Sequence, residues 1–174
     1  MSHSILTLNN TLSYEEKSFQ YNQIAPFEGF GDSYLAANLG KETTLEDFHA
    51  KAGVTFDNSI TGKLSGFIGY TDYNYGYNSA LELDEGRITN RFKGNLIHAG
   101  AEYEKEYKGF QLYGKMGVNV SGDFDANYLL GRAAFNFNEN NAVRASVKLH
   151  STAPNFNFLL YQSDYVNYLS LIHI

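Results

Sequence analysis

The sequence has no cysteine among its 174 residues, and tryptophan is absent as well. Without cysteine there is no disulfide framework, no thiolate zinc site and no cysteine nucleophile. Basic residues are in deficit too, because 13 Lys and Arg stand against 19 Asp and Glu, for a net charge of −6. A mildly acidic chain gives no reason to expect nucleic acid as a partner.

Long apolar runs are also missing. No stretch of about 18 apolar residues is present, which excludes a membrane-spanning helix. The opening residues, MSHSILTLNNTLSYEEK, have neither the basic region nor the apolar region of a secretory signal. A mature membrane β-barrel requires neither feature, because its strands are about 9–11 residues long and only half apolar.

Aromatic residues and glycine are abundant instead. Tyr occurs 14 times, Phe 13 times and Gly 16 times, whereas Pro occurs only 2 times. Together with Asn, these residues are typical of an all-β surface protein and not of a helical enzyme. The length is sufficient for one domain with a real core.

The stretch FQLYGKMGVNV, residues 110–120, alternates apolar or small residues with polar ones without a break. A period of two predicts a β-strand with two unlike faces. The pattern recurs, in places blurred, at residues 6–14, 47–56, 63–73, 96–107, 128–137 and 142–151. We therefore expect about seven strands of roughly ten residues, which is long for a soluble sheet, where about 5–6 residues is usual.

Short and long connections alternate along the chain. Residues 57–62, 108–109 and 138–141 are short segments of turn-forming residues. Longer polar, acidic or Tyr-rich segments lie between them, at 16–43, 76–94 and 121–126. Alternate connections of an up-and-down meander lie at the same end of the sheet. The sequence thus predicts one end with tight turns and one with long loops, an asymmetry that outer-membrane β-barrels show.

A soluble β-sandwich or a lipocalin-like binding protein is the alternative outside membranes, and it would turn its polar strand faces to water. Three features favour a membrane barrel. The apolar faces are rich in Ala and Gly, which makes a thin core but an adequate lipid face. Aromatic residues gather near strand ends, as in interfacial girdles. Charged residues and His recur at mid-strand on the polar faces, where a water-filled lumen would use them.

Three segments resemble the putative porin family of Gram-negative outer membranes. They read HSTAPNFNFLLYQSDYVNY at 150–168, YTDYNYGYN at 70–78 and HSILTLNNTLSYEEKSFQY at 3–21. The resemblance covers most of the chain and implies a membrane β-barrel with passive transport. It implies no catalytic residues. The chain departs from the family in being smaller than its barrels, in lacking an N-terminal signal and in having no terminal Phe.

The last six residues, LSLIHI, break the polar pattern and resemble the translation of a sequencing adapter. We expect residues 1–168 to be part of one barrel and 169–174 to be a non-native tail, with a short closing strand as the alternative. About seven strands also do not give the even number that single-chain bacterial barrels use. We therefore expect an incomplete chain that forms an open curved sheet and conducts nothing by itself.

No segment predicts catalysis, a cofactor or a bound metal. The stretch DFDAN, residues 123–127, has the alternate acids of a calcium loop, but Tyr128 and Ala134 stand where that loop requires Gly and Glu. His49 and His98 are weak candidates for a metal site, and polar lining is the better interpretation for both. No P-loop, dinucleotide fingerprint or serine-hydrolase motif occurs. We expect the protein not to be an enzyme.

The sequence therefore predicts an all-β, antiparallel up-and-down meander that is part of an outer-membrane barrel of porin type. Its expected partners are outer-membrane lipid and small hydrophilic solutes that diffuse through a polar lumen, with selectivity set by pore width and lining charge. The predicted lining residues are His49, Lys51, His98, Glu102, Gln111, Lys115, Arg132, Arg144 and Lys148. Most of them are Lys, Arg or His, which predicts a preference for anions.

A second membrane interpretation is a complete eight-stranded barrel, with residues 156–168 as its last strand. A barrel of that size is filled with side chains and does not conduct. It would be an anchor or an adhesion protein.

Overall fold

The structure is a computed structural model of the whole chain. It describes residues 4–23, 29, 39–78, 82–83, 86–87, 89–138, 141–163 and 167–169. The seven strands of the main sheet are β1 (Ser4–Gln23), β2 (Leu39–Asn58), β3 (Gly62–Tyr77), β6 (Arg91–Tyr107), β7 (Phe110–Gly122), β8 (Asn127–Asn138) and β9 (Asn141–Ser151). The smaller elements are β4 (Glu82–Leu83), β5 (Gly86–Arg87), α1 (Phe156–Leu159), β10 (Leu160–Gln162) and β11 (Asn167–Leu169).

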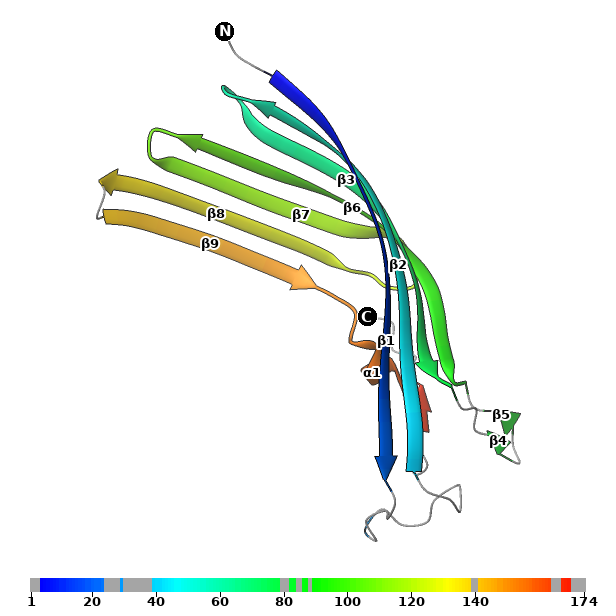
Figure 1. Cartoon of the computed structure of the whole chain (residues 1–174). Coiled ribbons are helices and arrows are strands. Elements are labelled where there is room, and N and C mark those ends of the chain that lie inside the picture. The colour runs from blue at the N-terminus through cyan, green and yellow to red at the C-terminus, as the bar shows by residue number, and fades with distance from the viewer. Residues whose placement is uncertain are drawn as a thin grey trace. The chain divides into compact units, whose positions relative to one another are not determined.

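The main sheet is an antiparallel meander. Its strand order, β1-β2-β3-β6-β7-β8-β9, follows the chain, apart from the β4–β5 hairpin between β3 and β6. Figure 1 shows β7, β8 and β9 side by side and alternating in direction. The strands β1 and β9 are the two edges of an open sheet. The predicted fold class and the predicted number of strands are confirmed.

The strands are longer than the sequence predicted. β1 and β2 each contain 20 residues, and β3 and β6 contain 16 and 17. The predicted connection 16–43 is therefore too long, because β1 continues to Gln23 and β2 begins at Leu39. The predicted connection 76–94 is too long as well, since β6 begins at Arg91. In these strands the apolar pattern ends before the strand does, because the backbone hydrogen bonds of a sheet do not require apolar side chains.

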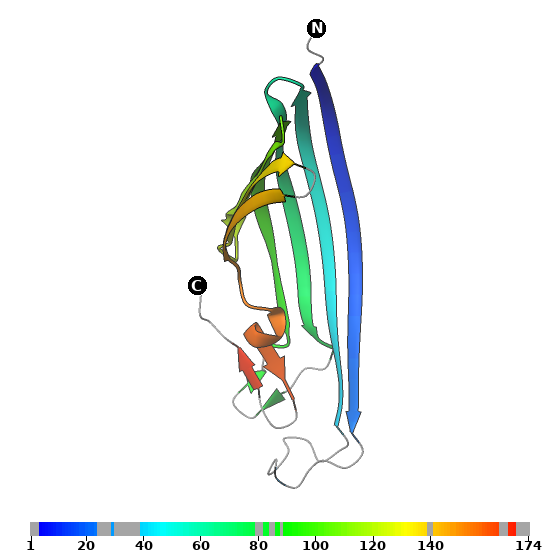
Figure 2. The ribbon, with the colours of Figure 1, turned by 90° about the vertical axis from the view of Figure 1, so that its left-hand side faces the viewer.

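The segment after β9 does not add an eighth strand to the sheet. The Asn155 side chain accepts a hydrogen bond from the Phe156 backbone N–H and caps the short helix α1. The strands β10 and β11, which follow α1, pair with each other and not with the main sheet. They can be followed in orange and red in Figure 2. The prediction of an eighth strand at 156–168 is wrong. Of the predicted non-native tail, residues 170–174 lie outside the described residues, and Leu169 ends β11.

The chain forms two compact units. The first unit comprises residues 1–13, 49–71 and 95–153, and the second comprises residues 14–48, 72–94 and 154–174. All the buried hydrophobic residues of the described chain belong to the second unit: Tyr73, Tyr75, Tyr77, Leu159 and Leu160. The described strands of the first unit thus form a sheet without a buried hydrophobic core.

The ends of the first unit support the predicted grouping of the tight turns. The Lys105 ammonium donates hydrogen bonds to the carbonyl oxygens of Ser59 and Ile60, which places the turn between β2 and β3 next to the end of β6. The Asn136 N–H donates to the Gly109 carbonyl at 2.9 Å, near the end of β8. At the opposite end of β6, the Asp123 carboxylate accepts from the Asn95 N–H at 3.0 Å. The tight turns therefore share one end, away from the 123–126 connection.

Long connections also meet in the second unit. The Asn78 N–H donates to the Glu42 carbonyl at 3.2 Å, and the Tyr77 N–H donates to the Asn90 carbonyl at 2.8 Å. The end of β3 therefore lies beside the start of β2 and the start of β6. This is the arrangement expected when the loops before β2 and before β6 belong to one end of the meander.

The β6–β7 turn supplies a first test of the fold. Gly109 has a φ of 79°, and a Cβ atom there would lie 2.8 Å from the Asn136 carbonyl oxygen. We expect Gly109→Ala to lower the free energy of unfolding by about 1–3 kcal/mol, measured by urea denaturation of the folded chain. Gly114→Ala is the matched control, because a Cβ atom at Gly114 meets nothing within 4 Å. Equal destabilisation by both variants would contradict the turn geometry.

Candidate functional site

The candidate site is the pair of faces of the main sheet. Residues directly opposite each other in paired strands point to the same side. The β6–β9 registers align Ala101, Met116, Leu129 and Leu149 in one row. The neighbouring rows are Tyr103, Gly114, Gly131 and Val147, then Lys105, Leu112, Ala133 and Ala145, and then Tyr107, Phe110, Phe135 and Val143. Lys105 is the charged residue of these rows, and its ammonium donates to carbonyl oxygens of the β2–β3 turn. We call this side the apolar face.

The apolar face is open to solvent. Val120 is 63% exposed, Leu149 is 59% exposed and, in β1, Leu8 is 75% exposed. Monomeric soluble proteins rarely leave such a large continuous apolar surface uncovered, and such a surface marks contact with a protein or a membrane. The apolar face therefore requires an apolar environment that the described chain does not itself provide.

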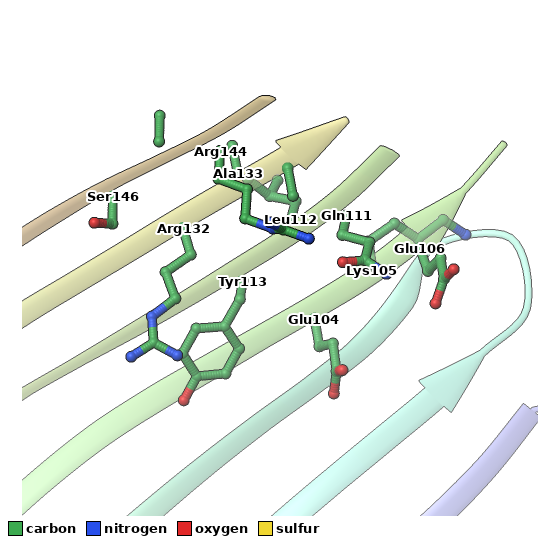
Figure 3. Close-up of a pocket in the computed structure, with 12 residues that line it drawn as sticks. Glu104, Lys105, Glu106, Gln111, Leu112, Tyr113, Arg132, Ala133, Arg144 and Ser146 are labelled. Carbon is green, nitrogen blue, oxygen red and sulfur yellow. The ribbon is translucent and has the colours of Figure 1, made fainter. Parts of the chain in front are cut away.

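The opposite side, which we call the polar face, has equally regular rows. The first contains Glu102, Lys115, Leu130 and Lys148. The next two contain Glu104, Tyr113, Arg132 and Ser146, and then Glu106, Gln111, Ala134 and Arg144. Six of the predicted lining residues lie together here: Glu102, Gln111, Lys115, Arg132, Arg144 and Lys148. The side chains of Glu104, Tyr113 and Arg132 can be compared in Figure 3.

The other three predicted lining residues lie around Phe67. The His49 Nδ1 atom lies 2.8 Å from the Thr71 hydroxyl oxygen. The Lys51 ammonium lies 3.9 Å from the centre of the Phe67 ring, and His98 meets the same ring edge-on with centroids 6.0 Å apart. Phe67, which blurred the alternation in the sequence, is thus an aromatic partner for polar side chains. On the same side, Thr55 connects Asn9 to Ser65 by hydrogen bonds of 3.2 and 2.9 Å.

The polar face separates acids from bases. Glu102, Glu104 and Glu106 all belong to β6, whereas Lys115, Arg132, Arg144 and Lys148 belong to β7, β8 and β9. Sequence reasoning missed Glu104 and Glu106, although the alternation in EYEKEY continues through them. Among the described residues, no ion pair joins these acids to these bases. Glu102 lies directly opposite Lys115, whereas Tyr113 stands between Glu104 and Arg132 in the second row. In the third row, Gln111 and Ala134 stand between Glu106 and Arg144.

A hollow of about 540 Å³ lies over this part of the sheet. Its polar lining includes Glu104, Glu106, Tyr113, Arg132 and Arg144 (Figure 3). The Arg132 guanidinium lies 5.9 Å from the centre of the Tyr113 ring. The arrangement can attract charged solutes and give them hydrogen bonds. Within the described residues, no group of three or more potential metal ligands comes together.

In the second unit, one side of β2 and β3 is polar. In β2, the side that carries Phe48 next carries Glu46, and in β3 the side that carries Tyr70 later carries Asn74. The Asn74 amide donates to Glu46 at 2.7 Å, and Arg91 donates to Asn74 at 3.3 Å and to Asn78 at 2.7 Å. These residues form a polar network on β2, β3 and β6.

The other side of these strand segments is aromatic. In β3, Tyr73, Tyr75 and Tyr77 continue the series of residues that forms the polar face farther along the strand. The Phe156 ring of α1 stacks on Tyr75 with centroids 5.4 Å apart and lies 4.9 Å from Tyr73. Leu160 of β10 is 1% exposed and completes this cluster. The sequence contained these Tyr residues, but nothing in it identified α1 as their cover.

Two further observations concern binding and membrane contact. The Asp123 carboxylate, part of the DFDAN stretch, accepts from the Asn95 N–H, so this acid has a structural partner. Among the described residues, no helix has both the length and the apolar composition to cross a bilayer.

Comparison with known proteins gives one match. A family model described as "Putative porin" matches residues 2–172, which is nearly the whole chain. No curated protein and no solved structure matches the chain.

The polar network of the second unit generates a second test. Arg91→Met removes the donor that connects Asn74 to Asn78, and leaves their amide oxygens without this partner. We expect the variant to lose about 1–3 kcal/mol of stability. The measurement is faster amide hydrogen exchange in residues 72–77. Lys93→Met is the control, because Lys93 is exposed two residues farther along the same strand. Equal exchange rates in the two variants would contradict a structural role for Arg91.

Proposed function

Because the chain belongs to the putative porin family, we propose that it forms part of the wall of an outer-membrane β-barrel. Small hydrophilic solutes would diffuse through this barrel. The observation that carries the proposal is the exposure of two unlike faces on one sheet. The apolar face would contact lipid, and the polar face would line a water-filled lumen. No chemical step is required, because solutes would move down their concentration gradient.

The dimensions of the apolar face support contact with a bilayer. In β7 this face runs from Phe110 to Val120, about 33 Å along the strand at 3.3 Å per residue. A strand tilted by about 45° would place this length across about 23 Å, close to the apolar band of about 25 Å that membrane barrels present. Aromatic residues bound the band, with Tyr14, Phe48 and Tyr70 toward one end and Phe110, Phe135 and Phe137 toward the other. Such residues suit the two membrane interfaces.

The composition of the polar face supports a preference for anions. In the first unit, its strands carry the cations Lys51, Lys63, Lys115, Arg132, Arg144 and Lys148 and the acids Asp57, Glu102, Glu104 and Glu106. A wall with this positive excess would raise the local concentration of anions. The negative charge of the whole chain is consistent with this, because most acidic residues lie elsewhere.

The two edges of the sheet imply that more strands are needed. Backbone N–H and C=O groups that face hydrocarbon without a partner cost several kcal/mol each. The strands β1 and β9 present such groups at the edges of the described sheet. In a bilayer, these edges would pair with further strands, from another copy or from another polypeptide segment. A soluble β-sandwich would instead need a second layer over the apolar face, and no described element covers the exposed residues of β7 and β9.

Substitutions at mid-strand test the assignment of the faces. Ala101, Val118 and Ala133 lie on the apolar face. We expect Arg at any of these positions to cost about 2–4 kcal/mol of folding free energy in lipid vesicles. Lys115→Arg and Lys148→Arg, on the polar face, are the controls and should be nearly neutral. If both sets are tolerated equally, the apolar face does not contact lipid.

Solute flux tests the transport function. The purified chain would be separated into monomers and assemblies, and each fraction would be reconstituted into vesicles. The entry of sugars would then be measured by the swelling of the vesicles. We expect no flux from monomers, because their sheet edges are open, and flux from assemblies in which the edges are paired. In conducting assemblies, R132Q together with R144Q should lower the ratio of anion to cation permeability, whereas K93Q should not. Lack of flux in every assembly, or steady flux from monomers, would contradict the proposal.

A further inference from the structure

The hollow over the polar face differs in charge from the rest of that face. It lies entirely in the first unit, and on this side of the sheet it contains two acids and two bases: Glu104 and Glu106 of β6, Arg132 of β8 and Arg144 of β9. On the remainder of the polar face in this unit, bases outnumber acids. The hollow is therefore electrically balanced within a face that is otherwise positive, and what distinguishes it is the placement of its charges.

The acids and the bases stand on opposite sides of the hollow. In one row, Tyr113 separates Glu104 from Arg132, as Figure 3 shows. In the next row, two residues separate Glu106 from Arg144. Neighbouring strands lie about 4.8 Å apart, so the backbones that carry the opposite charges are about 10 Å apart in the first row and about 14 Å apart in the second. Among the described residues, none of these four charged groups takes part in an ion pair, so all four can meet a solute.

The space between the charges suits a neutral group that contains an amide. Ala134 contributes only a methyl group there, and Gln111 supplies both an amide donor and a carbonyl acceptor. The half-buried Tyr113 offers its ring, whose centre lies 5.9 Å from the Arg132 guanidinium. The volume of about 540 Å³ falls within the range of small-molecule sites, about 300–1,000 Å³. The hollow thus has a negative side, a positive side and a middle that can form hydrogen bonds with a peptide group.

We propose that this hollow binds peptides of two or three residues with free ends, the ammonium on the side of Glu104 and Glu106 and the carboxylate on the side of Arg132 and Arg144. The inference rests on the proposed function, in which the polar face lines a water-filled lumen. An extended chain spans at most about 3.3–3.6 Å per residue, so three residues cover about the 10 Å between the nearer charged strands. A free amino acid has its two charges too close together to reach both sides, and an inorganic anion uses the bases alone.

Binding at this hollow is weak and reversible. The four charged side chains are exposed, and ion pairs with exposed side chains contribute little, because water competes for them. A solute that has to leave the lumen again requires such a site, since tight binding would stop its passage. The hollow would therefore raise the local concentration of short peptides without trapping them.

Four peptides of one length test the two sides separately. Tri-alanine carries both charges, N-acetyl-tri-alanine only the carboxylate, tri-alanine amide only the ammonium, and N-acetyl-tri-alanine amide neither. Their binding to the full chain in detergent micelles would be measured by saturation-transfer NMR at about pH 6.5, where the α-amino group is protonated. We expect tri-alanine to bind about threefold more tightly than either singly blocked peptide and about tenfold more tightly than the doubly blocked one, as two weak ion pairs predict.

Paired substitutions assign each side of the hollow. With E104Q and E106Q together, tri-alanine should bind no more tightly than N-acetyl-tri-alanine. With R132Q and R144Q together, it should bind no more tightly than tri-alanine amide. Each pair should keep the preference for the other charged end, which shows that the variant is folded. The control combines E16Q with K93Q, at exposed positions of the second unit, and should leave the order of the four peptides unchanged.

The outcomes separate the peptide site from the transport function. Equal binding of the four peptides, or an order that the paired substitutions leave unchanged, would overturn the site. Binding in micelles does not require conduction, so this result would leave the proposed function standing. In conducting assemblies, tri-alanine at low concentration should enter vesicles about threefold faster than the doubly blocked peptide, and equal entry would also overturn the site. Lack of flux in every assembly would overturn the proposed function instead, even where the expected order of binding holds.

Discussion

The alternation of side chains along β-strands is the constraint on which the rest of the structure depends. Hydrogen bonding between strands fixes the register, and the register fixes which side chains share a face. In β6–β9, this constraint assembles Ala101, Met116, Leu129 and Leu149 on one side and Glu102, Lys115 and Lys148 on the other. A slip of one residue in any strand would place charges among the apolar side chains. The regular rows therefore specify both the sheet and its two unlike faces.

The sequence predicted the features that depend only on the alternation of side chains. It did not predict the features that depend on packing between distant segments. The seven strands, their meander order and the grouping of the tight turns followed from period-two segments and turn residues. The extent of β1 and β2 did not, because residues such as Glu16 and Glu42 fall within the predicted connection 16–43 and yet continue a strand with polar side chains. The position of α1 was also out of reach. Nothing local to FNFL indicates that Phe156 stacks on Tyr75, about eighty residues earlier in the chain.

The grouping of candidate residues on one face was predictable for the same reason as the strands, and their role as pore lining stays a prediction. Four basic residues lie on one face because each occupies a polar position in the alternating pattern of its own strand: Lys115, Arg132, Arg144 and Lys148. The sequence did not reveal that acids collect on β6 while bases collect on β7–β9, since this requires the register between strands. Glu104 and Glu106 lie beyond the middle of β6, and they join the polar face only because the strand keeps its alternation to Tyr107. The polar network of the second unit likewise appears only when the strands are aligned. In it, Arg91 donates hydrogen bonds to Asn74 and Asn78.

The central claim is that one sheet separates lipid from water, and residues 110–120 of β7 test it most directly. Single-Cys variants at each of these positions would carry an environment-sensitive fluorophore in lipid vesicles. If the sheet separates lipid from water, the quenching of the fluorophore should alternate with a period of two along the strand. Labels at the even positions, such as Leu112, Met116 and Val118, should be quenched by a lipid-borne quencher. Labels at the odd positions, such as Tyr113, Lys115 and Asn119, should be quenched by a water-soluble one. Quenching that does not alternate, or that alternates in the opposite phase, would show that these two faces do not contact lipid and water as proposed.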